Sequence, residues 1–261
     1  MSAGALAAAL AGSAAAALLA HRAGTLSRSG TVAAWMVGSA VLAGTGWQGG
    51  GVLAAFFVSS SLISRGAPAP RGLDPKGERR DHRQVLANGG VAAAVALVGL
   101  HDTPLGLWLL TAALAAAAAD TWATALGARS ATAPRLLLGG RAVPPGTSGG
   151  VTPLGTLGGA AGALGVATLG ALLSGISTLL PVAALVGFGG MTLDSALGGA
   201  QGRFRCPRCA EPSEWPRHRC GTATVHEGGL AWLDNDGVNL ASSAAAALIA
   251  GVAWGLLCPC T

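Results

Sequence analysis

The sequence predicts an all-α, polytopic membrane protein in which about eight transmembrane helices form one bundle. Of its 261 residues, 51% are hydrophobic and only 10% are charged, whereas a soluble domain carries about 25% charged residues. The mean hydropathy is +0.56. Alanine and glycine are abundant, and such small side chains let transmembrane helices pack closely. We therefore expect a single integral membrane domain over residues 1–261.

Eight apolar segments divide the chain, and several approach the ~20 residues that a spanning helix needs. The first has the apolar core of a secretory signal, but its basic residue, Arg22, follows the core. A cleavable signal carries its charges before the core, so we expect a retained helix. Trp47, Trp108 and Trp254 fall near segment ends, where tryptophan forms aromatic belts. The segments cover roughly residues 3–20, 29–46, 50–65, 84–101, 105–126, 154–178, 181–200 and 237–257.

The basic residues occupy alternate connections between these segments. All 16 Lys and Arg residues lie within 22–28, 65–83, 129–141 and 203–219. The other connections have none, so the positive-inside rule predicts cytoplasmic basic loops and both termini outside. We expect a bacterial cytoplasmic membrane. The loop over 65–83 is either a lipid-headgroup patch, with ~1 kcal/mol per basic residue, or a polyphosphate contact.

Four predicted helices start on the cytoplasmic side, after stretches rich in Gly, Ser, Thr, Asn and Asp. The clearest stretch runs over 144–156 and has Arg135 and Arg141 nearby. Glycine-rich backbone before a helix start binds phosphate through its N–H groups. No Gly-Lys-Ser/Thr follows, so this is not a P-loop, and a flexible connector is the alternative. The candidate phosphate contacts are Gly146, Thr147, Ser148, Gly149 and Gly150.

Two carboxylates, Asp120 and Asp194, lie inside apolar segments near their cytoplasmic ends. A charge within the bilayer costs ~2.5–3.5 kcal/mol on insertion scales, so such residues usually face a cavity or a partner. They are therefore candidates for a metal or substrate site, with a structural hydrogen bond or ion pair as the alternative. Asp234 and Asp236 border the last helix, as caps or as further metal ligands. Asn88 is either a structural hydrogen-bonding residue or a substrate contact.

The cytoplasmic loop over 201–235 contains a C-x2-C-x8-H-x-C pattern. This spacing fits a zinc site whose four protein ligands make it structural rather than catalytic. The predicted side of the membrane is reducing, which argues against a disulfide, and unbound thiols are the alternative. For Cys258 and Cys260, the free, intermolecularly paired and lipidated states all remain open. The four candidate zinc ligands are Cys206, Cys209, His218 and Cys220.

Six stretches of the sequence match one known pattern: residues 26–30, 84–89, 119–124, 144–152, 194–195 and 232–239. Together they resemble the membrane family described as domain of unknown function 92. This family includes a plant phytyl-phosphate kinase and is distantly similar to dolichol and phytol kinases that use CTP. The resemblance implies transfer of a phosphoryl group from CTP, or another nucleoside triphosphate, to phytyl or geranylgeranyl monophosphate. The six stretches span nearly the whole chain.

On this resemblance, Asp120 and Asp194 would hold Mg²⁺ with help from Asp234 or Asp236, and Asn88 would contribute to catalysis. The family usually has Glu at the position of Ala125. Glu227 or the Asp234 and Asp236 pair would then compensate, or activity would be altered. The nucleotide would contact Ser27, Arg28, Gly146, Thr147, Ser148, Gly149, Gly150, Asn235 and Asn239.

The expected partners are an isoprenyl monophosphate, a nucleoside triphosphate and membrane lipids, with no nucleic acid. The acceptor phosphate has a second pKa near ~6 and is largely ionised at neutral pH, so it needs little help from a general base. One alternative is a cytidylyltransferase, which forms a CDP-lipid and releases pyrophosphate. The other is a transporter that uses Asp120 and Asp194 as ion sites. The short, almost uncharged outer connections favour an enzyme over a transporter.

Overall fold

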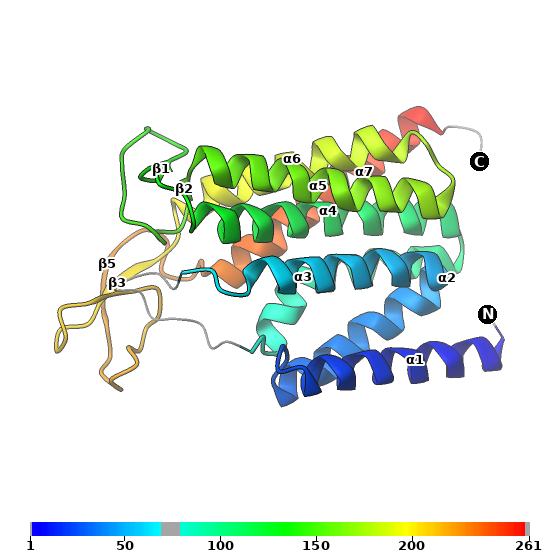
Figure 1. The fold of residues 1–261 in the computed structure, drawn as a ribbon, viewed down its shortest axis with the longest axis horizontal. Coiled ribbons are helices and arrows are strands. Elements are labelled where there is room, and N and C mark those ends of the chain that lie inside the picture. Colours follow the sequence, from blue (N-terminus) through cyan, green and yellow to red (C-terminus); the bar gives the residue numbers. More distant parts are fainter. Residues whose placement is uncertain (1, 69–78, 259–261) are drawn as a thin grey trace.

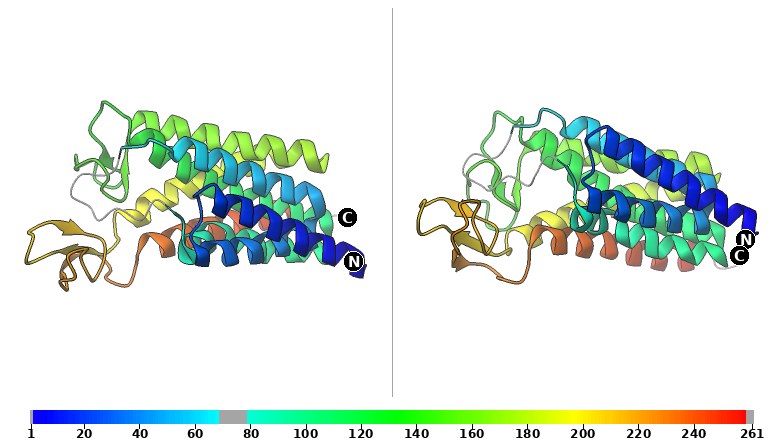
Figure 2. Two further views of the ribbon diagram at one scale, coloured as in Figure 1. Left: turned by 60° about the horizontal axis from the view of Figure 1, so that its bottom comes forward. Right: turned by 90° about the horizontal axis from the view of Figure 1, so that it is seen from below.

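The computed structural model describes residues 2–68 and 79–258, and within these ranges it is a bundle of long helices (Figures 1 and 2). Seven helices there are long and apolar enough to cross a membrane. The predicted polytopic helical membrane fold is therefore confirmed. The helices are α1 (Ala3–Arg22), α2 (Arg28–Ser64), α3 (His82–Ala96, continued by a 3-10 turn over Leu97–Leu100), α4 (Thr103–Gly127), α5 (Pro153–Ser174), α6 (Leu179–Gly198) and α7 (Asn235–Leu257).

Helix α2 consists of two arms that fold back on each other. Its 37 residues would extend ~55 Å as one straight helix, against ~30 Å for the hydrocarbon core of a bilayer. Gly46 interrupts it with φ 63° and ψ −157°, a conformation that only glycine adopts readily. In a straight helix, residues 42 and 50 would be ~12 Å apart. Here a Cβ atom built on Gly50 would lie only 2.5 Å from Leu42 Cδ2, so the arms on the two sides of Gly46 face each other. The two arms match the second and third predicted segments, so the described helices supply eight helical passes.

Helix α4 is the central helix of the bundle. Its alanine-rich stretch from Ala112 to Ala119 is buried throughout, because α5, α6 and α7 pack around it. Glycines allow this close approach: a Cβ atom on Gly162 of α5 would lie 2.8 Å from the Ala118 carbonyl oxygen. Asp120 follows this stretch directly. The central position of α4 therefore places a carboxylate beside several neighbouring helices.

Two of the three tryptophans expected in aromatic belts lie in the core instead. Trp108 is fully buried and donates a 2.8 Å hydrogen bond from Nε1 to the Ala250 carbonyl oxygen. It packs edge-to-face on Trp254, with ring centroids 5.2 Å apart. The belt prediction is wrong for both residues, because the two rings pack on each other in a buried cluster between α4 and α7. Trp47, in contrast, is 68% exposed.

One end of the bundle carries the long connections over 128–152 and 199–234, which we call the loop end (Figure 1). The first residues of α1 and the last residues of α7 lie at the opposite end, as both termini were predicted to do. That the loop end is cytoplasmic remains a prediction from charge. Arg71, Lys76 and Cys260 lie outside the described residues.

The loop end contains two small antiparallel sheets. Strand β1 (Arg135–Leu136) pairs with β2 (Gly150–Val151) just before α5 begins. In the second sheet, β3 (Arg203–Arg205) lies between β4 (Pro212–Ser213) and β5 (Val225–Gly228). The first sheet fixes the end of the glycine-rich stretch, and the second forms the frame of the Cys/His loop.

Candidate functional site

A cavity of about 1260 Å³ extends from the loop end into the bundle. It is lined by residues of all seven helices and of both long connections. Most of the residues proposed from the sequence for catalysis and nucleotide binding meet here, although they come from distant parts of the chain. Those that line the cavity are Asn88, Asp120, Gly146, Thr147, Ser148, Gly149, Gly150, Asp194, Asn235, Asp236 and Asn239.

The polar end of the cavity is built around two carboxylates from different helices. Asp120 of α4 and Asp194 of α6 are both half-buried and interact with each other. With its amide nitrogen turned toward them, Asn239 of α7 lies 2.9 Å from Asp194 Oδ2 and 3.3 Å from Asp120 Oδ2. Ser242 Oγ donates a 3.3 Å hydrogen bond to Asp194 Oδ2. Three helices thus converge on one carboxylate pair.

This pair has the chemistry of a divalent cation site. Two neighbouring carboxylates repel each other unless a proton or a cation compensates their charge. Mg²⁺ prefers oxygen ligands and is commonly held by one or two carboxylates together with substrate phosphates. Asp120 and Asp194 supply those carboxylates, and the amide side chains of Asn235 and Asn239 lie beside them. The donor set therefore fits a magnesium ion that is shared with a phosphorylated ligand.

The glycine-rich stretch forms a tightly held wall of the same cavity. Gly149 has φ 77°, and a Cβ atom on it would lie 2.4 Å from the Gly199 backbone nitrogen. The loop therefore packs against the end of α6, which also carries Asp194. Ser148 Oγ donates a hydrogen bond to a Glu214 carboxylate oxygen. The short strand β2 connects this loop to α5. Thr152 is the N-cap of α5, and its Oγ1 accepts a 3.0 Å hydrogen bond from the Gly155 N–H.

Three other proposed residues do not line the cavity. Ser27 is the N-cap of α2 and accepts a hydrogen bond from the Gly30 N–H at 3.1 Å. Arg28, the first residue of α2, is exposed. Asp234 caps α7, and its other oxygen lies 2.7 Å from an Arg83 guanidinium nitrogen. The structure therefore gives Ser27 and Asp234 structural contacts.

Asp236 both lines the cavity and contacts Arg83. It lines the cavity and is only 8% exposed, and its Oδ2 lies 3.6 Å from Arg83 Nε. Arg83 therefore bridges the two acidic residues at the start of α7. Since Arg83 already compensates this charge, the pair formed by Asp120 and Asp194 is the stronger candidate for metal binding.

Sequence reasoning missed Glu214, a cavity residue that belongs to the Cys/His loop. No pattern links it to the glycine-rich stretch, because the two segments meet only through the folding of the loop end. Ala125, where the resemblance led us to expect Glu, is buried and also lines the cavity. Glu227 pairs instead with Arg205 on β3 and does not line it. Glu214 is therefore a better candidate than Glu227 to replace that missing carboxylate.

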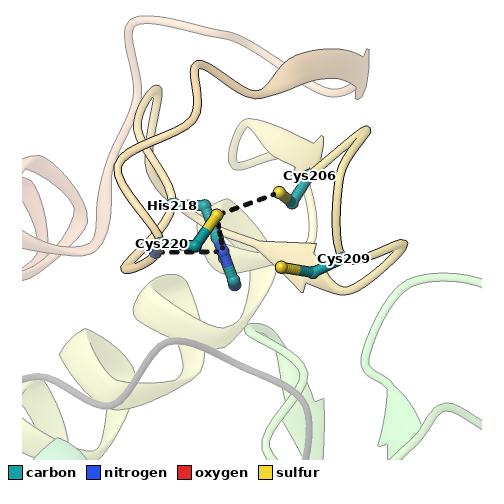
Figure 3. A group of neighbouring side chains, drawn as sticks. All are labelled: Cys206, Cys209, His218 and Cys220. Carbon is teal, nitrogen blue, oxygen red and sulfur yellow. Dashed lines mark hydrogen bonds between the residues drawn. The ribbon is translucent and has the colours of Figure 1, made fainter.

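The four proposed zinc ligands lie together in the Cys/His loop (Figure 3). Their ligand atoms are all within 4.8 Å of one another, and none of the described cysteines forms a disulfide. Hydrogen bonds to Thr222 and His218 lower the pKa of the Cys220 thiol to about 5. Hydrogen bonding to Cys220, with smaller effects of desolvation and of a hydrogen bond to Cys206, raises the pKa of the Cys209 thiol to about 11. The lowered pKa favours the thiolate of Cys220, which is the form that binds metal.

Away from the carboxylates, the cavity continues as an apolar groove between α1 and the two arms of α2. Trp47 and Val58, which line the groove, are more than half exposed. We call this part the tail groove, and it is lined by Gly12, Ala16, Ala20, Ala34, Leu42, Trp47, Leu53, Ala54, Phe57 and Val58. The cavity therefore has a polar head region and an apolar extension within the membrane-spanning part.

Comparisons with known proteins agree with the motifs in the sequence. The model of a family described as "Integral membrane protein DUF92" matches residues 11–247. Protein PGR of Arabidopsis thaliana is 30% identical over 251 residues, which cover 84% of this chain and 85% of that protein. Uncharacterized membrane protein MJ0933 of Methanocaldococcus jannaschii is 29% identical over 188 residues, 70% of this chain and 77% of that protein. No solved structure shows a significant match.

Proposed function

We propose that this chain, which belongs to the DUF92 family of integral membrane proteins, is an isoprenyl-phosphate kinase. It would transfer the γ-phosphoryl group of CTP, or another nucleoside triphosphate, to phytyl or geranylgeranyl monophosphate. One observation carries the proposal: a single cavity joins the carboxylate pair and the glycine-rich loop to the apolar tail groove. A ligand that fits such a cavity has a phosphorylated head and a long apolar tail.

The size of the cavity supports two ligands rather than one. Pockets for one small molecule are typically ~300–1000 Å³, and this cavity is about 1260 Å³. The head region would hold the triphosphate together with the acceptor phosphate, and the tail groove would hold the prenyl chain. Each buried methylene of that chain contributes ~0.8 kcal/mol. Binding energy from the tail would thus hold the acceptor phosphate near the carboxylates.

The reaction needs positioning and charge neutralisation more than proton transfer. An acceptor phosphate oxygen attacks the γ-phosphorus, the bond to the β–γ bridging oxygen breaks, and the nucleoside diphosphate leaves with that oxygen. The acceptor oxygen is already ionised near neutral pH, because its second pKa is ~6. Asp120 and Asp194 would hold Mg²⁺, which neutralises charge on the phosphates. Asn239 orients both carboxylates, and the backbone from Gly146 to Gly150 would donate N–H groups to phosphate oxygens.

Product analysis tests the proposed reaction. The purified protein in lipid nanodiscs is incubated with Mg²⁺, phytyl monophosphate and either CTP or ATP, and lipids and nucleotides are then measured by mass spectrometry. We expect phytyl diphosphate and nucleoside diphosphate in equal amounts. A CDP-lipid with pyrophosphate would identify a cytidylyltransferase instead. Absence of any nucleotide-dependent product from phytyl and geranylgeranyl monophosphate would contradict the proposal.

Blocking the tail groove should impair long acceptors selectively. Ala54 is exposed on the second arm of α2 and lines the groove, so Ala54→Trp should exclude part of the prenyl chain. We expect the KM for geranylgeranyl monophosphate to rise about tenfold, the equivalent of roughly two lost methylene contacts. The KM for the shorter geranyl monophosphate should hardly change.

The matched control is Ala160→Trp, on an exposed part of α5 that does not line the cavity. This variant should keep the wild-type KM for both acceptors. Equal effects of the two tryptophans, or equal effects of Ala54→Trp on short and long acceptors, would place the prenyl chain elsewhere.

A further inference from the structure

We propose that Cys206, Cys209, His218 and Cys220 bind one structural zinc ion, and that this ion holds a wall of the cavity in place. The wall consists of Glu214 and Trp215, which line the cavity and follow β4 in the Cys/His loop. The zinc site itself is independent of the proposed kinase activity. Its connection to the cavity rests on contacts of the loop, whatever ligand the cavity binds.

The spacing of the ligand atoms matches a tetrahedral zinc site. All four atoms lie within 4.8 Å of one another, and the sulfurs of Cys206 and Cys220 are 3.6 Å apart. Two thiolates on a tetrahedral zinc with Zn–S bonds of ~2.3 Å are separated by ~3.8 Å. A disulfide requires ~2.05 Å between sulfurs. The arrangement is thus that of ligands around an ion rather than of a disulfide.

The backbone between the first two cysteines is shaped to direct both sulfurs inward. The Cys206 N–H donates to the Glu211 carbonyl oxygen, and the Ala210 N–H donates to the Cys206 carbonyl oxygen, each at 2.9 Å. Ala210 has φ 56°, and it is the one non-glycine residue with positive φ in the described part of the chain. Such a backbone persists only where its surroundings impose it. A shared metal ligand set immediately beside Ala210 provides that constraint.

His218 is held in a metal-binding orientation. Its Nδ1 faces the Cys220 sulfur at 3.1 Å, and its Nε2 lies 3.2 Å from a Glu211 carboxylate oxygen. A zinc-bound histidine usually gives its second ring nitrogen to a carboxylate or carbonyl, which fixes the ring. Arg219 in turn contacts Glu211 at 3.0 Å. The His218 side chain is nearly fully buried, so the loop closes around the proposed ion.

The same loop is in direct contact with the cavity. Glu214 and Trp215 both line it, and Glu214 accepts a hydrogen bond from Ser148 in the glycine-rich loop. The Trp215 carbonyl oxygen is held at 2.6 Å by Thr224 Oγ1, near β5. These contacts connect the ligand-bearing turns to the cavity wall. Since the loop has few large buried apolar side chains, a metal ion would supply the folding energy that a small core cannot.

Metal analysis is the first test. We purify the protein without chelators and measure its metals by inductively coupled plasma mass spectrometry. We expect one zinc per chain, and its loss in Cys209→Ser. Cys258→Ser, outside the loop, and Ala210→Gly, within the same turn, should both keep zinc. Wild-type protein without zinc, a Cys206–Cys220 disulfide in its peptide map, or full zinc in Cys209→Ser would overturn the proposal.

Limited proteolysis then tests the structural role without any nucleotide or lipid. Trypsin cleaves after arginine, and Arg208, Arg217 and Arg219 lie in the exposed part of the loop. Removing zinc should speed cleavage at these sites about tenfold or more, because the loop would open locally. Glu214→Gln should keep both zinc and protease resistance, since it alters the cavity contact alone. Cleavage at these sites that is equally fast with and without zinc would contradict the structural role.

Discussion

Asp120→Asn should abolish phosphoryl transfer while leaving the helical bundle intact. Asparagine has nearly the volume of aspartate and can still accept a hydrogen bond from Asn239, so the packing around α4 should persist. It removes the negative charge that would hold Mg²⁺. Loss of an outer-shell partner costs ~10–100-fold in metal affinity or activity, so loss of a direct ligand should cost at least ~100-fold in kcat/KM.

The control for this substitution is Asp81→Asn. Asp81 is the N-cap of α3 and forms a capping box with Gln84, and asparagine is an equally good N-cap. It does not line the cavity, so kcat/KM should stay at the wild-type level. The assay is kcat/KM at several Mg²⁺ concentrations. Near-normal turnover of Asp120→Asn with an unchanged Mg²⁺ requirement would remove Asp120 from the metal site.

Gly149→Ala should have the second-largest effect. Its φ of 77° is strained for alanine, and the new Cβ would lie 2.4 Å from the Gly199 nitrogen and 2.7 Å from the Ser195 carbonyl oxygen. It would also lie 2.8 Å from Gly199 Cα. Because all three of these atoms belong to the backbone, the glycine-rich loop must move away from α6. A displacement of ~1 Å at a reacting group can cost ~100-fold, so we expect a loss of this order in kcat/KM for the nucleotide.

Gly139→Ala separates this clash from backbone strain alone. Gly139 has φ 85°, but a Cβ atom there would meet nothing within 4 Å, and it does not line the cavity. Both variants therefore carry similar local strain, of ~1–3 kcal/mol. Steady-state kinetics should show near-normal activity for Gly139→Ala. Equal losses in the two variants would mean that strain, and not the position of the loop, is responsible.

The fold could be predicted because its signals are local. Apolar length marks each helix, and the alternation of basic loops assigns both chain ends to one face. The carboxylates were recognisable for a related reason: a charge inside an apolar segment is costly, so Asp120 and Asp194 needed a partner. The structure supplies it by bringing both to Asn239, although about 120 residues separate Asp120 from that amide.

Contacts between segments that are distant in the sequence could not be predicted from such local signals. Trp108 and Trp254 were predicted to lie at the membrane interface because they are near segment ends. No pattern in the neighbouring sequence shows that α4 is the central helix. Glu214 carries no motif, and only the folded loop brings it to Ser148. For Asp234, capping and metal binding were both compatible with the sequence. The structure shows the cap and adds a contact with Arg83, which no sequence pattern indicates because it requires the start of α3 to lie beside the start of α7.

The most direct measurement follows the γ-phosphate itself. Nucleoside triphosphate labelled with ³²P at the γ-position is incubated with Mg²⁺, geranylgeranyl monophosphate and the protein, and the lipid and aqueous fractions are counted. We expect the label in the terminal phosphate of the lipid diphosphate, with no transfer by Asp120→Asn. Label found entirely in pyrophosphate or inorganic phosphate, with an unlabelled lipid, would contradict phosphoryl transfer to an isoprenyl phosphate.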